Sequence, residues 1–254
     1  MHDVAESLRA ARMAMAHGFF TRRGGVSTGP FASLNCSLSS QDDRDAVLHN
    51  RARAARAIGA DPALMLGMTQ VHGAEVVRVT DAWPAGAGPR ADAMVTDRPG
   101  LALGIVTADC APVLFEDPEA GVIGAAHAGW RGAVAGVLEA TLAAMAELGA
   151  RNITAAVGPC ISQASYEVGA DLRDAVLARD PSDGRFFAAG QRPDHWQFDL
   201  SGYCEARLSA GGATVEVLST DTLADDTRFF SHRRRTRAGG GPIGHQLSAI
   251  HLPR

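Results

Sequence analysis

The clearest fold signal in this chain is the segment Val122-Ile123-Gly124-Ala125-Ala126-His127-Ala128-Gly129-Trp130-Arg131-Gly132. Its first half, Val122–Ala126, is an apolar β-like run. From Gly132 to Leu148 the apolar residues return every three or four positions, which is the period of one helical face, and Gly149 then supplies a C-terminal stop signal. We therefore predict a buried strand that leads directly into a helix, the connection on which α/β proteins are built.

Similar β-like runs lie on both sides of this segment, each bounded by Gly, Pro, Asp or Asn. They are Gly18–Thr21, Met65–Gln70, Ala74–Val79, Ala93–Thr96, Leu101–Val106, Val113–Glu116, Ile153–Val157 and Thr214–Ser219. Further helices are predicted over Arg44–Ile58, Ala170–Ala178 and Asp199–Leu208, the last with Asp199 as N-cap. Strands stand in adjacent groups early in the chain and alternate with helices later, which favours a mixed sheet. No repeat or linker divides the chain, so we expect a single-domain α/β fold over residues 1–254, an αβα sandwich with a mixed β-sheet and with surface loops at Ala82–Ala91 and Arg233–Gly244.

The composition is that of a globular protein with a mild acidic balance. The 254 residues are 46% hydrophobic and 20% charged, and 24 basic against 28 acidic side chains give a net charge of −4. A chain without a basic excess is a poor candidate for sequence-independent nucleic-acid binding. All of the basic residues are arginines, and the absence of lysine excludes Schiff-base chemistry and a P-loop lysine.

The expected compartment follows from segments that the sequence lacks. No stretch approaches the roughly 18 consecutive apolar residues of a membrane span. The opening Met1–Arg9 carries acids early and no long apolar run, so it does not resemble a secretory signal. The four cysteines contain no C-x-x-C pair, which argues against a disulfide framework and a zinc ribbon. We expect a cytoplasmic protein.

Three reactive side chains lie at the ends of predicted strands. His72 stands at the junction between two strands, Cys110 just past the end of another, and His127 between Val122–Ala126 and the helix. A rigid sheet delivers such side chains to one edge, where α/β proteins assemble their sites. Two imidazoles and a thiolate suit Zn²⁺, with the fourth tetrahedral position open, and the same set suits copper. The alternative is a buried Cys110 with two inert turn histidines.

Other polar residues are assigned by their position. We expect most remaining histidines to be surface or internally satisfied residues: His2, His17, His49, His195, His245 and His251. Arg131 lies at the predicted helix start beside His127, where a guanidinium and the helix N-terminus would both favour a phosphate or carboxylate. Asp109, beside Cys110, is a candidate acid/base group or support of a metal ligand, or else a turn former.

Seven motifs, taken in order, resemble those of the laccase-domain polyphenol oxidase family, also described as purine nucleoside phosphorylases of the YfiH type. They are His17–Ser27, Ser33–Asn35, Thr69–Gly73, Thr107–Pro112, Ala126–Gly132, Gly158–Ile161 and Phe230–Arg234. The resemblance spans nearly the whole chain. One departure follows the last motif, where the family tends to continue with an acidic residue and Thr-Gly-Arg, whereas this chain has Arg235 and later Gly244-His245-Gln246.

The resemblance implies an αβα sandwich with mixed strands and a zinc or copper site formed by His72, Cys110 and His127. It implies phosphorolysis of adenosine, inosine and methylthioadenosine, and deamination of adenosine, with purine nucleosides and phosphate as small-molecule partners. From the acidic balance and the lack of an apolar span we expect no nucleic-acid or membrane partner. The residues that we expect to bind substrate or phosphate are Arg22, Arg23, Asn35 and Arg131. The residues that we expect to take part in catalysis are Cys110, His127 and Asp109.

Two other functions remain open at this point. The family has an older association with copper-dependent oxidation of phenols, but nine scattered histidines without an H-x-H pair give little support for a multicopper cluster. A cysteine hydrolase with Cys110 as nucleophile and His127 as base would need no metal and would not need His72. We therefore predict a zinc-dependent enzyme acting on purine nucleosides, followed in order by the copper oxidase and the cysteine hydrolase.

Overall fold

The computed structural model describes residues 5–254, so His2 lies outside the described residues, and the strands of this range form three sheets. The five-stranded sheet has the order β1-β2-β14-β6-β3, which are Ser7–Leu8, His17–Phe20, Gln246–His251, Ala102–Thr107 and Met65–Leu66. The six-stranded sheet has the order β13-β9-β7-β8-β5-β4, which are Thr214–Val217, Thr154–Val157, Ala111–Asp117, Val122–Ala128, Ala93–Thr96 and Val76–Arg78. A three-stranded sheet has the order β10-β12-β11, which are Glu167–Val168, Trp196–Phe198 and Phe187–Ala189. The β3–β6, β4–β5 and β9–β13 pairs are parallel and the others antiparallel, which confirms a mixed α/β fold.

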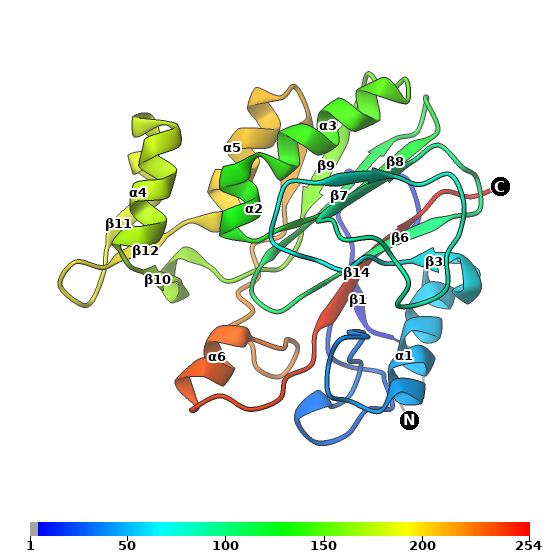
Figure 1. Ribbon diagram of the computed structural model, residues 1–254, viewed down its shortest axis with the longest axis horizontal. Helices are drawn as coiled ribbons and strands as arrows, with labels where there is room; N and C mark the ends of the chain where they lie inside the picture. The colour runs from blue at the N-terminus through cyan, green and yellow to red at the C-terminus, as the bar shows by residue number, and fades with distance from the viewer. Residues whose placement is uncertain (1–4) are drawn as a thin grey trace.

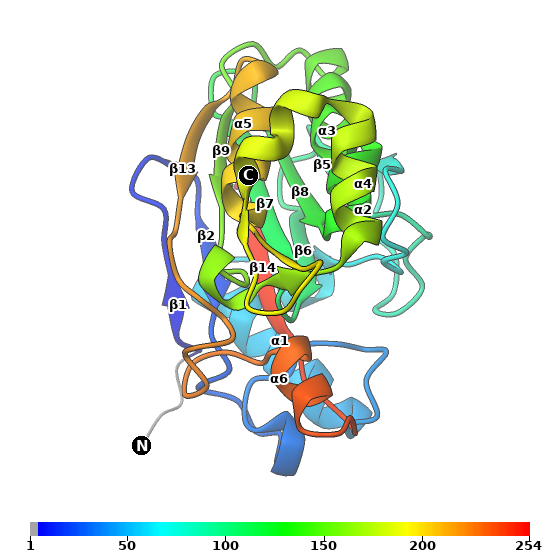
Figure 2. The same ribbon diagram turned by 90° about the vertical axis from the view of Figure 1, so that its left-hand side faces the viewer.

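Helices cover both outer sides of the two larger sheets (Figure 1). The α-helices are α1 (Arg44–Ala57), α2 (Trp130–Ala135), α3 (Val137–Glu147), α4 (Ala170–Arg179), α5 (Leu200–Ala210) and α6 (His232–Arg237). Short 3-10 helices are η1 (Gly29–Phe31), η2 (Pro62–Leu64), η3 (Gln163–Ser165) and η4 (Pro181–Phe186). Figure 1 shows α3 and α5 on one side of the strands and α1 on the opposite side. The perpendicular view in Figure 2 keeps the same arrangement.

Side-chain alternation along β7 shows how the sheets are stacked. Val113 and Phe115 belong to the apolar cluster that includes Leu138 of α3, whereas Leu114 belongs to the cluster that includes Leu103 of β6. A third cluster joins α1 to the other face of the five-stranded sheet. The αβα order of layers therefore holds, and its middle layer consists of two stacked sheets, which periodicity along one strand cannot indicate.

The single helix predicted over 132–148 is wrong, because α2 and α3 are separate helices. The break is Gly136, which has φ 98° and ψ 26°, a left-handed conformation that glycine adopts at low cost. Apolar residues continue at helical spacing on both sides of Gly136, so the periodic pattern did not reveal the break. The predicted stop at Gly149 is confirmed, since its N–H donates to Ala146 O and closes the last turn.

Two other predicted segments differ from the structure in their bounds, and one predicted loop agrees with it. The predicted strand Met65–Gln70 ends at Leu66, and the Gln70 amide then makes two hydrogen bonds to the backbone of Val106 at 2.8 and 2.9 Å in place of strand pairing. The predicted loop Arg233–Gly244 is wrong in its first half, which belongs to α6, capped by the Ser231 side chain. The loop at Ala82–Ala91 is confirmed.

The sequence predicts the start of α5 correctly but does not predict the C-terminal strand. Asp199 caps α5 as predicted, accepting a hydrogen bond from Gly202 N at 2.9 Å. Strand β14 was not predicted, although it lies between β2 and β6 in the five-stranded sheet. Within residues 5–254, no helix is both long enough and apolar enough to cross a membrane.

Candidate metal centre and cavity

His72, Cys110 and His127 converge at one side of a cavity of about 630 Å³. Their potential ligand atoms all lie within 4.8 Å of one another, and the two imidazole centroids are 4.7 Å apart with the rings nearly perpendicular. His72 comes from the loop between β3 and β4, Cys110 from the β6–β7 connection, and His127 from β8. The structure thus brings together three side chains that are 38 and 17 positions apart in sequence.

A buried carboxylate that the sequence reasoning missed organises this trio. Asp92, directly before β5, is fully buried, and its Oδ1 lies 2.8 Å from His127 Nδ1. Burial raises the pKa of Asp92, but hydrogen bonds from His127 and from the Gly73 and His72 backbones outweigh this effect and leave the pKa below its usual value. An ionised carboxylate only accepts hydrogen bonds, so His127 donates its Nδ1–H to Asp92, and Nε2 is the nitrogen that would bind a metal after losing its proton.

The same carboxylate fixes the loop that carries His72. Asp92 accepts hydrogen bonds from the backbone N–H groups of Val71 at 3.1 Å, His72 at 2.9 Å and Gly73 at 2.7 Å. His72 has a φ of 61°, in the left-handed region that non-glycine residues rarely occupy. The three hydrogen bonds hold this unfavourable backbone conformation in place, so Asp92 positions both imidazoles at once.

The trio also depends on a residue without a side chain. A Cβ atom placed on Gly129 would lie 3.0 Å from His72 Cδ2 and 3.1 Å from Cys110 Sγ, closer than ordinary van der Waals contact. Gly129 follows β8 directly and precedes α2. The glycine therefore allows the connection from strand to helix to pass against the three ligand side chains.

The charges of the trio favour metal coordination. Burial raises the pKa of Cys110, but the positive charge and hydrogen bonds of His127 and His72 lower it to about 6. Burial lowers the pKa of His127, but the Cys110 charge and the Asp92 hydrogen bond raise it to about 9. A thiolate and two imidazoles that face one point fit Zn²⁺ or copper, and three ligands leave a coordination position open.

Asp109 is buried in the cavity wall, and both of its carboxylate oxygens accept hydrogen bonds from the protein. Its Oδ1 accepts from Thr222 Oγ1 at 2.7 Å, and its Oδ2 accepts from Ser231 Oγ at 2.9 Å and Arg233 N at 2.6 Å. Its own φ is 85°, again left-handed. These bonds connect the Cys110 loop to the first turn of α6, which makes Asp109 a positioning residue in this arrangement.

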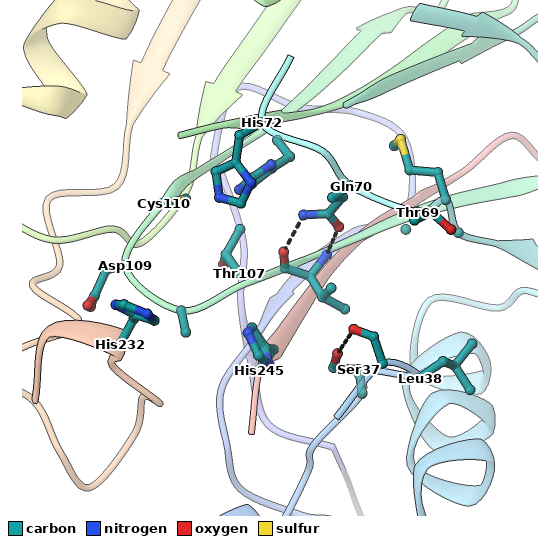
Figure 3. A pocket seen from close by; sticks show the side chains of 18 of the residues that line it. Ser37, Leu38, Thr69, Gln70, His72, Thr107, Asp109, Cys110, His232 and His245 are labelled. Carbon is teal, nitrogen blue, oxygen red and sulfur yellow. Dashed lines mark hydrogen bonds between the residues drawn. The ribbon is translucent and has the colours of Figure 1, made fainter. Parts of the chain in front are cut away.

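The remaining cavity wall is aromatic and cationic near the trio and contains two unpaired polar atoms. Trp130, Tyr166 and Arg131 line it, with the Arg131 guanidinium carbon 4.3 Å from the centroid of the Trp130 ring. Thr107 Oγ1 and His245 Nδ1 are buried without a hydrogen-bond partner among the described residues. In Figure 3, Thr107 and His245 lie between His72 and Cys110 on one side and Ser37 and Leu38 on the other.

Three expected substrate ligands do not line the cavity. Arg22 and Arg23 instead donate from Nε to backbone carbonyl oxygens at 2.7 and 3.0 Å. Asn35 is fully buried, and its Oδ1 accepts from the backbone N–H groups of Ser37 at 3.2 Å and His245 at 2.9 Å. Asn35 thus supports two residues of the cavity wall without lining the cavity.

Two histidines of the wall were missed from the sequence. His245 was expected to be a surface or satisfied residue, which is wrong because it lines the cavity with an unpaired Nδ1. Burial, reinforced by the charges of His232 and His127, lowers the pKa of His245 to about 4, so its imidazole is neutral. His232 also lines the cavity, from the start of α6. Asp92 gave no signal of its role, since an Asp directly before a strand is an ordinary boundary residue in sequence.

The stacked mixed sheets and the His–Cys–His donor set at one sheet edge define a class of α/β proteins with a candidate metal centre. Residues 16–253 match the family described as multi-copper polyphenol oxidoreductase laccase, and the chain belongs to that family. It is similar to the Bacillus licheniformis hypothetical protein YfiH, with a TM-score of 0.85 and 31% identity over 93% of this chain and 92% of that one. YlmD from Geobacillus stearothermophilus gives a TM-score of 0.87 and 30% identity over 98% of this chain and 100% of that one.

The proteins that are similar to this chain in sequence are named for a different activity from the one in the family description. The chain is 44% identical over 88% of its length to purine nucleoside phosphorylase ORF3 of Streptomyces griseus, covering 91% of that protein. It is 41% identical over 97% of its length to a purine nucleoside phosphorylase of Deinococcus radiodurans, covering 93% of that protein. The family description names an oxidase, whereas these relatives are named as phosphorylases.

Proposed function

We propose that this protein is a metal-dependent purine nucleoside phosphorylase with adenosine, inosine and methylthioadenosine as substrates. The observation that carries the proposal is the convergence of His72, Cys110 and His127 at the wall of a cavity large enough for a small ligand. The names of the relatives at 41% and 44% identity support the same reaction class.

The metal would be held by His72, Cys110 and His127, with zinc as the first candidate and copper as the alternative. When bound, the ion would supply Lewis acidity to a polar group of the substrate at the open coordination position. Asp92 would keep both imidazoles in the ligating orientation, since its Oδ1 accepts hydrogen bonds from both the His127 ring and the His72 backbone N–H.

The cavity wall offers the contacts that a purine nucleoside needs. Trp130 and Tyr166 provide aromatic surfaces against which a planar base can pack. Thr107 Oγ1 and the neutral His245 imidazole are buried polar groups without protein partners, and such groups are costly unless a ligand or water satisfies them. A nucleoside offers both donors and acceptors to these atoms.

In phosphorolysis a phosphate oxygen bonds to C1′ of the sugar as the bond from C1′ to the base nitrogen breaks. The bonding electrons leave with the purine, and the proton of the hydrogen phosphate ends on the base, so the products are a free purine and a pentose 1-phosphate. Arg131 would hold the phosphate near the trio; its position in the cavity wall and the match between a guanidinium and phosphate oxygens support this assignment.

Adenosine deamination, in which water replaces the amino group of the base and releases ammonia, is part of the same proposal. Incubation of adenosine with the purified protein separates the two activities. We expect adenine and ribose 1-phosphate only when phosphate is present, and inosine with or without phosphate. The absence of all three products from protein with stoichiometric metal would contradict the proposal.

Two alternatives are tested by the same preparation. A multicopper oxidase needs several copper ions, and within residues 5–254 the trio is the one group of three potential ligands that lies close together. Elemental analysis of protein purified without added metal, combined with measurement of oxygen uptake on phenols, distinguishes one zinc ion from several copper ions.

The cysteine hydrolase is the second alternative. The side chains of Asp92, His127 and Cys110 follow one another in the order of the acid, base and nucleophile of a cysteine hydrolase triad. Such a hydrolase would survive the loss of His72, whereas a metal enzyme would not.

A further inference from the structure

The end of the cavity away from the metal trio contains a buried arginine, Arg51 of α1. Its exposed fraction is only 6%, yet it lines the cavity. Its Nη1 donates to Cys36 O at 3.3 Å and its Nη2 to Met65 O at 3.4 Å, both long for charged hydrogen bonds. A guanidinium has five N–H donors, so most of its hydrogen-bonding capacity remains unused.

Arg51 has no counterion in the part of the chain that the structure describes. No carboxylate among residues 5–254 pairs with it, and the neighbouring Cys36 thiol is neutral, because burial raises the pKa of that thiol to about 12. Burial also lowers the pKa of Arg51, but an arginine side chain remains protonated at neutral pH. A buried charge without a partner is strongly unfavourable, so such a group in a cavity wall indicates a ligand of opposite charge.

Neighbouring groups at this end reinforce the positive potential. Arg44 lies two helical turns before Arg51 on the same face of α1 and also lines the cavity, with its Nη2 donating to Ala85 O at 3.0 Å. The segment Ser37–Ser39 lines the cavity beside the carbonyl that Arg51 contacts. In Figure 3, Ser37 and Leu38 lie on the side of the cavity opposite His72 and Cys110.

We propose that Arg51 and Arg44 form a phosphate subsite at the end of the cavity opposite the metal trio. The subsite takes a phosphate group carried either by inorganic phosphate, the co-substrate of phosphorolysis, or by the 5′ position of a nucleoside monophosphate. This inference rests on the proposed function for the class of ligand. If the subsite binds inorganic phosphate, Arg51 and Arg44 replace Arg131 as the phosphate ligands of the proposed reaction.

The test is isothermal titration calorimetry on the purified full-length protein with its metal, at fixed ionic strength in buffer without phosphate or sulfate. The ligands are inorganic phosphate, adenosine 5′-monophosphate and adenosine. We expect Arg51→Gln to weaken binding of at least one phosphate-bearing ligand by about 10- to 100-fold, and to leave adenosine affinity within about twofold. Arg44→Gln, at an exposed position, weakens the same ligand by about two- to fivefold. Arg56→Gln, on the same helix but outside the cavity, is the matched control.

Each outcome of these titrations either supports or contradicts the phosphate subsite. A loss confined to inorganic phosphate assigns the subsite to the co-substrate, and a loss confined to the monophosphate assigns it to a nucleotide. The proposal is overturned if the wild type binds neither ligand, or if folded Arg51→Gln binds both as the wild type does. If Arg51→Gln does not fold, Arg51→Lys replaces it. Unchanged affinities in both Arg51→Lys and Arg44→Gln then overturn the proposal.

The outcome is separable from that of the proposed function. Phosphate binding that depends on Arg51, in a protein that converts no nucleoside, would retain the subsite and reject the phosphorylase. Nucleoside phosphorolysis with a phosphate affinity independent of Arg51 would do the reverse.

Discussion

The two ends of the cavity balance their charges in opposite ways. At the metal end, the imidazole of His127 faces the buried carboxylate of Asp92 at 2.8 Å, and the Cys110 thiolate lies against both histidines. At the other end, the guanidinium of Arg51 donates hydrogen bonds to two carbonyl oxygens at 3.3 and 3.4 Å, and no described carboxylate pairs with it. The metal end is organised before any ligand arrives, whereas the arginine end is electrostatically incomplete without one.

The difference indicates what each end contributes. A site whose ligands are held by their own hydrogen bonds binds a metal with little rearrangement, which favours a resident cofactor. A site with an uncompensated charge favours an exchangeable anion, because the anion supplies the missing interaction each time it binds.

The largest effect is expected from loss of a metal ligand. His72→Ala should lower nucleoside phosphorolysis by about 10³-fold, because Lewis-acid assistance is worth several kcal/mol. Metal content measured by elemental analysis should fall with it. His49→Ala, an exposed histidine on α1, is the control and should retain both. Substantial activity in metal-free His72→Ala would favour the cysteine hydrolase.

Loss of the supporting carboxylate should have the next largest effect. Asp92→Asn removes the charge that orients His127 and places an amide near backbone N–H groups, so metal affinity should fall about 10- to 100-fold. Competition with a chromophoric chelator measures this change. Asp97→Asn, just beyond the other end of β5, is the matched control, and equal affinities for the two variants would contradict the role of Asp92.

The pH dependence of Cys110 alkylation tests the electrostatics of the metal end. In metal-stripped protein, the pKa of about 6 means that the thiolate predominates above pH 6 and is lost as the pH falls through 6. The rate of iodoacetamide labelling, followed by peptide mass spectrometry, should therefore have its midpoint near pH 6 and not near about 8.5, the usual cysteine value. His127→Gln should raise the midpoint, and bound zinc should block labelling. The buried Cys36, with a pKa of about 12, is an internal control that should stay unlabelled.

The smallest effect is expected at the arginine end in the absence of ligand. Arg51→Met should change the free energy of unfolding by less than about 1 kcal/mol in phosphate-free buffer, because removal of an unpaired buried charge offsets the loss of two long hydrogen bonds. Asp92→Asn should lower the same free energy by about 2 kcal/mol, since it leaves buried groups unsatisfied. Urea denaturation measures both values. A loss above about 3 kcal/mol for Arg51→Met would identify Arg51 as a structural clamp.

Local patterns predicted most elements of the fold, and their errors have physical causes. The predicted strand Ala93–Thr96 and the predicted start of a helix at Arg44 agree with the structure, because a turn-forming Asp stands directly before each segment. The break at Gly136 was missed because one left-handed glycine does not interrupt apolar periodicity. The shortening of the strand after Leu66 was missed because a side chain, that of Gln70, satisfies the neighbouring backbone instead.

The sequence by itself determined the α/β class and singled out His72, Cys110 and His127, because strand ends, turn residues and reactive side chains are readable along the chain. Only the tertiary structure decided that Asp92 supports both imidazoles, that Arg22 and Arg23 lie outside the cavity, and that Arg51 and His245 line it. The physical reason is that hydrogen bonding and burial depend on neighbours far away in sequence. An arginine or histidine has the same letter whether water, a carboxylate or an empty cavity faces it.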